Sequence, residues 1–200
     1  MENEFTLADE GGIVVLTLVS ADGTNRLTRR KVAALSEEVR RLACGNPVRP
    51  LVIAGRPAFS AGADLREISE LSGPQAWRFA KMGQELMNAV EQYPAPVYAA
   101  IERYCMGGGL DLALACHRRV ASGHTVFGHR GAALGLITGW GGTQRMARLV
   151  GRGKALEMLV AAEKLHARQA WEIGLVTAIA EDPVGEAIHR IREAREQTTS

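Results

Sequence analysis

Two glycine-punctuated segments hold the residues of this chain best suited to chemistry: FSAGADL, from Phe59 to Leu65, and MGGGLDLALAC, from Met106 to Cys116. Each follows an apolar run typical of a strand, at residues 50–54 and 96–101, and each leads into a helix-compatible pattern. Glycine lets main-chain N–H groups approach a ligand closely. The first N–H groups of a helix lack internal partners and lie at the positive end of its dipole. Two such turns brought together would therefore aim two donors at one oxyanion.

Triple glycines before a helix also occur in nucleotide-binding and phosphate-binding loops. Here Leu112 stands where the dinucleotide-binding spacing requires another glycine, and no Gly-Lys-Ser/Thr follows for a P-loop. We interpret Asp64 as the cap of a helix that begins near Leu65, which is the commonest use of an aspartate at such a position. The glycines themselves are interpreted as an oxyanion site.

The elements that must position these turns follow a strand-strand-helix pattern. The first two strands form a hairpin turned by Gly11-Gly12, and a long helical region is interrupted at Gly73-Pro74, as in a movable active-site segment. We expect strands at about residues 5–7, 13–18, 51–54, 97–101, 119–121 and 125–127, and helices at about 28–42, 65–93, 110–116, 143–149, 153–161, 167–173 and 184–195.

Five segments, which include the two glycine turns, resemble segments of the crotonase (enoyl-CoA hydratase/isomerase) superfamily and come in the same order along the chain. The resemblance runs from about residue 13 to residue 180. It implies an α/β fold, a crotonase-type spiral of repeated ββα units. It also implies an acyl-CoA thioester as substrate, with no permanently bound cofactor, whose carbonyl oxygen is held in an oxyanion hole by the N–H groups of Ala63 and Gly108. Beside the two glycine turns, the matching segments are Asn25-Arg26-Leu27, GWGGTQRMARLVG (139–151) and ARQAWEIGLV (167–176).

Members of this superfamily usually continue into a helical C-terminal region that packs against neighbouring subunits and covers part of the CoA. Little follows Val176 here, so most of that region is expected to be absent. We expect residues 1–182 to be the acyl-CoA-binding core and residues 183–200 a short helix with a polar tail. Trp140, Trp171 and the apolar face of residues 156–160 suggest surface left to bury, and hence a homo-oligomer, a trimer or a hexamer.

Hydratases of this superfamily place two glutamates beside the substrate, because water must lose a proton while the α-carbon gains one. The first position corresponds to Asp111, one methylene shorter, and the second to Gly131, which has no side chain. Weak hydratase activity is therefore expected. The dienoyl-CoA isomerase branch also uses an aspartate first, but its other acids would fall at Gly131 and Gly139. Glycine at the second position resembles the branch that makes dihydroxynaphthoyl-CoA, where bicarbonate is thought to replace the carboxylate.

Asp111 has a second interpretation, as an exposed or capping carboxylate in the first turn of a helix. His129 and Arg130 lie near the place of the missing acid, so either could supply a proton or hold an anion. A lone histidine is also often only packed or solvated, and we retain His129 as a catalytic candidate.

The resemblance places Thr138 and Trp140, with Gly131, in the substrate pocket, although both side chains also suit a structural role. Arg66 matches a basic position that contacts the CoA phosphates, and Ala61 lies in the same turn. The alternative for Arg66 is a solvated helix residue.

Composition is that of an ordinary globular enzyme domain, with 46% hydrophobic and 23% charged residues. A formal charge of +2 gives no reason to expect nucleic acid or membrane as a partner. The N-terminus shows no secretory signal. Three cysteines without a metal-like spacing predict reduced thiols in a cytoplasm, with Cys105 and Cys116 in the core, and no metal site is expected.

The sequence thus favours an enzyme of fatty acid metabolism that performs enoyl-CoA hydration or isomerisation, with Asp111 as the well-placed acid/base. Two alternatives stay open. One is a synthase, lyase or decarboxylase that uses bicarbonate, a substrate carboxylate or His129 as base. The other is a catalytically silent accessory subunit of a secondary-metabolite pathway.

Overall fold

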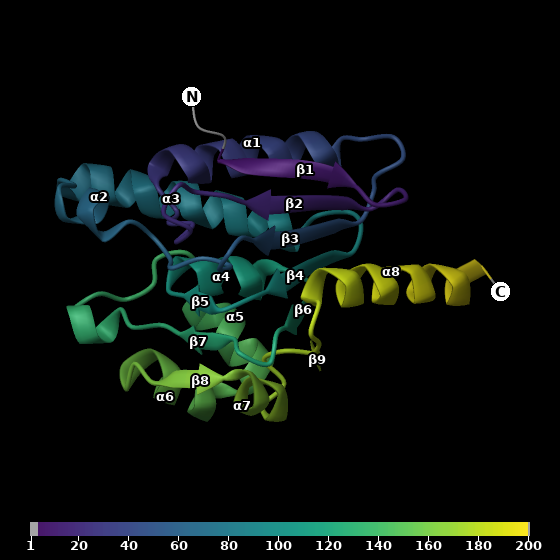
Figure 1. Ribbon diagram of the computed structural model, residues 1–200. Coiled ribbons are helices and arrows are strands. Elements are labelled where there is room, and N and C mark those ends of the chain that lie inside the picture. Colours follow the sequence, from purple (N-terminus) through teal and green to yellow (C-terminus); the bar gives the residue numbers. More distant parts are fainter. Residues whose placement is uncertain (1–3, 200) are drawn as a thin grey trace.

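The computed structural model describes residues 4–199, which form two β-sheets with helices packed on them (Figure 1). The larger sheet has the order β1-β2-β3-β4-β6-β9. Its first two strands form the predicted antiparallel hairpin, and the remaining neighbours pair in parallel. The strands are β1 (Phe5–Asp9), β2 (Val14–Leu18), β3 (Leu51–Gly55), β4 (Val97–Ile101), β6 (Arg118–Ala121) and β9 (Ala178–Ile179).

The smaller sheet consists of β5 (Tyr104–Met106), β7 (Val126–Gly128) and β8 (Lys164–His166). β5 and β7 are parallel, whereas β7 and β8 are antiparallel. An isolated bridge between Ser60 and Cys105 joins this sheet to the first glycine turn. The smaller sheet therefore connects the two turns that the sequence singled out.

One face of the larger sheet is covered by α1 (Arg29–Ala43), α3 (Gly73–Glu91) and α4 (Gly108–Ala115). The alternation of the strands decides which residues lie there, so Leu16 and Ile53 pack in this core. α1 begins after Thr28, whose side chain accepts the N–H of Lys31. It buries an apolar stripe made of Val32, Leu35, Val39 and Leu42.

The opposite face is covered by α8 (Pro183–Thr199), drawn in yellow in Figure 1. Ala187, Ile188 and Ile191 of this helix pack against Val15 and Val52, which point away from the first core. The helix is longer than the predicted 184–195, and its apolar side closes a second core.

The remaining helices are short: α2 (Leu65–Ser69), the 3₁₀ turn η1 (Ala132–Leu134), α5 (Gly142–Val150), α6 (Arg152–Val160) and α7 (Ala167–Glu172). The predicted break at Gly73-Pro74 is confirmed, because α2 ends at Ser69 and Pro74 lies in the first turn of α3. β5, β8 and β9 were missed, since strands of two or three residues are too short to show an alternating pattern. No helix of the described residues is long and apolar enough to cross a membrane.

Asn25 is fully buried and has φ 50°. It holds the chain segment that leads into the first glycine turn. Its Nδ2 donates to the carbonyls of Ala58 (2.7 Å) and Arg56 (3.2 Å). Asn25→Ala leaves a buried carbonyl unpaired and strains the backbone, so unfolding in urea should show a loss of about 2–4 kcal/mol.

Asn25→Gly is the matched variant, since glycine adopts positive φ without strain but also lacks the amide. It should be more stable than Asn25→Ala by about 1 kcal/mol, yet less stable than the unmodified protein. Equal stability of all three proteins would contradict a clamping role.

Candidate active site

The first glycine turn is held by the segment around Asn25. Leu27 N–H donates to the carbonyl of Gly62 at 2.8 Å, and Ser60 Oγ donates to the carbonyl of Asn25 at 2.8 Å. The same Oγ accepts the N–H of Gly62 at 3.1 Å. Gly62 has φ 96°, a conformation that favours glycine. These contacts fix the direction of the next N–H group, that of Ala63.

The second turn packs directly on the first. Gly107 has φ 51° and precedes α4, and its N–H donates to Gly128 of β7 at 2.9 Å. A Cβ on Gly62 would lie 2.7 Å from the Met106 carbonyl and 3.1 Å from the Gly108 nitrogen. A Cβ on Gly108 would lie 3.3 Å from the Ala63 nitrogen. The two backbones therefore approach closely only because these positions lack side chains.

Two N–H groups remain free at this contact. In the hydrogen bonds of residues 4–199, neither Ala63 N–H nor Gly108 N–H donates to a protein acceptor. Gly108 is the first residue of α4, so its N–H lies at the positive end of a helix. Both residues line one cavity. This arrangement has the geometry of a pair of donors for an oxyanion.

Asp111 lies in the first turn of α4 and is only 2% exposed. Thr138 Oγ1 donates to its Oδ2 at 2.6 Å. Its Oδ1 finds no hydrogen-bond partner in the described residues, and a Cβ on Gly142 would overlap it, so this oxygen lies against the first turn of α5. Asp111 is thus neither exposed nor a helix cap.

Trp140 forms a wall of the site and is buried against α3. Its ring meets that of Phe79 edge to face, with centroids 5.2 Å apart, and a Cβ on Gly83 would overlap it. The backbone N–H of Trp140 donates to Thr138 Oγ1 at 3.3 Å, and its backbone carbonyl accepts from Arg145 Nη1 at 3.0 Å. The loop that presents Thr138 to the carboxylate is thereby anchored at both α3 and α5.

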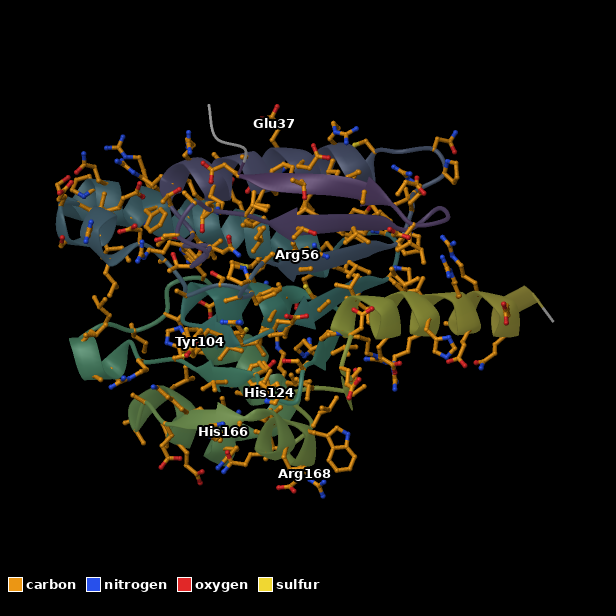
Figure 2. The ribbon with its side chains drawn as sticks, in the orientation of Figure 1. Glu37, Arg56, Tyr104, His124, His166 and Arg168 are labelled. Carbon is orange, nitrogen blue, oxygen red and sulfur yellow. The ribbon has the colours of Figure 1, made fainter. Side chains whose placement is uncertain are left out.

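His129 follows β7 and is 6% exposed. Its Nε2 lies 3.7 Å from Asp111 Oδ2 and, among the described residues, has no hydrogen-bond partner. Arg130 is exposed and lines the same cavity. His124 and His166, labelled in Figure 2, are exposed and do not line it.

The cavity has a volume of about 430 Å³. It brings together eight of the nine residues that the sequence proposed: Ala61, Ala63, Gly108, Asp111, His129, Gly131, Thr138 and Trp140. Its apolar walls were missed. They come from α2, α3 and the η1 loop, and they include Leu65, Ile68, Leu71, Phe79, Leu134, Leu136 and Ile137. The apolar run at residues 134–137 was the available signal, since such a run in a loop needs a partner.

Arg66 is the candidate that lies apart, because its exposed side chain is outside the cavity lining. The predicted cap at Asp64 is confirmed, as its Oδ1 accepts the N–H groups of Arg66 (2.8 Å) and Glu67 (3.3 Å). Cys105 and Cys116 are buried in the core as predicted, and burial raises the pKa of the Cys116 thiol to about 12. Such a thiol is a poor nucleophile.

Residues 8–199 match the family model described as enoyl-CoA hydratase/isomerase. The chain is 38% identical to a probable enoyl-CoA hydratase of Bacillus subtilis, over 90% of this chain and 70% of the relative. It is 32% identical to the short-chain-enoyl-CoA hydratase of Clostridium acetobutylicum, over 90% of this chain and 69% of the relative. A crystal structure of enoyl-CoA hydratase from Bacillus anthracis superimposes with a TM-score of 0.89 at 29% identity, covering 96% of this chain and 76% of that one.

Thr138 provides the prediction for this site. Thr138→Val keeps the shape of the side chain but removes the donor to Asp111 Oδ2, which leaves a buried carboxylate without a hydrogen bond. We expect a loss of about 1–3 kcal/mol in the free energy of unfolding at neutral pH. Thr138→Ser retains the hydroxyl and is the control. If the valine and serine variants unfolded at the same urea concentration, the hydrogen bond would contribute nothing.

Proposed function

Because the chain belongs to the enoyl-CoA hydratase/isomerase family, the crotonase superfamily of acyl-CoA enzymes, we propose that it stabilises a thioester enolate at Ala63 and Gly108. The supporting observation is that, in the part of the chain that the structure describes, these two N–H groups have no acceptor; they lie at the contact of the two turns, on the wall of a largely apolar cavity. Preorganised donors of this kind are each worth about 10²–10³ in kcat.

Asp111 is the proposed acid/base of the reaction, which is proton transfer at the α-carbon of an acyl-CoA during hydration or isomerisation. The carboxylate lines the same cavity as the two donors and is held by Thr138. Gly131 contributes no side chain, so the second carboxylate of a typical hydratase is missing. Hydration is therefore proposed to be slow relative to enzymes with two carboxylates.

The CoA thioester itself is the proposed substrate, with no permanent cofactor. Ala61 lines the cavity next to the first turn. Arg66 is exposed in the first turn of α2, where its guanidinium would be available to a phosphate of the CoA. We assign acyl-CoA binding to residues 1–182, since the cavity-lining residues lie between Ala61 and Trp140. Three free cysteines suit the reducing conditions of a cytoplasm.

Asp111→Asn tests this function. The unmodified protein should bind acetyl-CoA or crotonyl-CoA in calorimetry and should exchange α-protons of a saturated acyl-CoA with solvent deuterium, followed by NMR. The variant keeps a similar size but cannot accept the α-proton. Exchange should fall by about 10²–10⁴-fold while thioester binding persists.

Arg56→Gln, a change at an exposed side chain that does not line the cavity, is the matched control and should exchange normally. A folded protein that binds none of these thioesters would refute the proposal. Exchange that is equally fast in the Asp111→Asn variant would refute the role of the carboxylate.

Self-association is proposed because α6 and α7 expose large apolar side chains: Leu156 is 63%, Val160 65% and Trp171 47% exposed. Trp140 does not belong with them, contrary to the expectation from the sequence, because its ring is buried between α3 and α4. Light scattering should show a trimer or hexamer, and Leu156→Asp should weaken the assembly while Glu157→Gln on the same helix should not. A monomer of about 21.5 kDa at micromolar concentration would contradict this.

A further inference from the structure

Gly131 is the position at which the resemblance led us to expect a second acid, and the structure shows why no carboxylate projects from it. A Cβ built there would lie 2.8 Å from the Leu136 carbonyl and 3.4 Å from both Cε1 and Nδ1 of His129. The η1 turn folds back over Gly131, since Leu134 N–H and Leu136 N–H both donate to its carbonyl at 2.8 Å. The imidazole of His129 therefore lies in contact with the place where a side chain at residue 131 would begin.

The environment of His129 is unusual for a histidine that only packs in a core. The side chain is more than nine-tenths buried, lines the cavity and leaves Nε2 without a hydrogen-bond partner among the described residues. A buried polar atom without a partner costs about 1–3 kcal/mol. A histidine with a purely structural role would be expected to pair this nitrogen, so the atom is available for a ligand in the cavity.

The distance between the His129 imidazole and the Asp111 carboxylate indicates how large a ligand could lie between them. Nε2 of His129 and Oδ2 of Asp111 are 3.7 Å apart, which is too far for a direct hydrogen bond. One water or hydroxyl oxygen at about 2.8 Å from each atom would join them. Asp111 and Arg130 are the other charged side chains that line the cavity in the described residues, and Arg130 is exposed.

From this geometry we propose that His129 is the second acid/base of the site and replaces the carboxylate that Gly131 lacks. The inference rests on the proposed function, because it requires an acyl-CoA whose enolate is held at Ala63 and Gly108. It assigns two separate tasks: Asp111 serves the α-carbon, and His129 serves the oxygen at the β-carbon.

The step is simplest in the direction of elimination from a 3-hydroxyacyl-CoA. The ionised Asp111 takes the α-proton, and the C–H electron pair forms the enolate, with negative charge on the thioester oxygen. Protonated His129 gives its Nε2 proton to the β-hydroxyl. The Cβ–O bond breaks, water leaves and the enolate electrons form the C=C bond. The proton on Asp111 then passes to His129 through one water across the 3.7 Å gap, and hydration is the reverse sequence.

The test separates the two tasks in His129→Gln and His129→Asn. Hydration of crotonyl-CoA, and dehydration of 3-hydroxybutyryl-CoA, should fall by about 10²–10⁴-fold. Thioester binding and solvent exchange at the α-carbon of a saturated acyl-CoA should persist, because they need Asp111 and the two N–H donors. In His129→Gly, added imidazole should restore hydration, which a merely structural histidine would not allow.

His124→Gln is the matched control, since this histidine is exposed on the loop before β7 (Figure 2). Hydration that is unchanged in folded His129→Gln and His129→Asn proteins would overturn the inference. So would an unmodified protein that exchanges α-protons but hydrates no crotonyl-CoA. Absence of thioester binding in the unmodified protein would instead refute the proposed function, and this inference with it.

Discussion

The close approach of two backbone turns is the constraint on which the rest of this site depends. A side chain at Gly62 or Gly108 would collide with the opposite turn or with Trp140, so the contact exists only with glycine at both positions. It places the N–H groups of Ala63 and Gly108 on one wall without any adjustable side chain. Donors fixed by backbone packing need no reorganisation when negative charge develops near them. The positions of the two donors are therefore set by the backbone contact between the turns.

This geometry is maintained at a cost. Asp111 Oδ1 and His129 Nε2 are buried without hydrogen-bond partners among residues 4–199, and such groups destabilise a folded chain by about 1–3 kcal/mol each. Packing on the far side of the cavity offsets part of this cost. Arg145 joins the Trp140 carbonyl to Glu91 and Asn88 of α3, and the Trp140 ring packs edge to face on Phe79. Unpaired polar atoms tend to survive where a function requires them.

Much of the fold was predictable from residues whose local signals agree with their environment. The stripe of α1, the break before Pro74 and the Asp64 cap all follow from periodicity or capping chemistry within a few residues. β5 and β8 carry no such signal, because three residues do not establish an alternation. The cavity walls escaped prediction for another reason. Leu134 and Ile137 become walls only when the η1 loop comes to face α2 and α3 across the cavity, which is a long-range event.

Gly131 shows why a motif read along the chain gives only part of a site. By position, the second acid is absent, and the sequence alone left bicarbonate, a substrate carboxylate and His129 as alternative replacements. In space, a Cβ at residue 131 would lie 2.8 Å from the Leu136 carbonyl, and the ring of His129 lies against the same place. Catalysis depends on where a proton acceptor lies and not on which residue number carries it. A 3.7 Å separation from Asp111 therefore weighs more than the loss of a carboxylate in the motif.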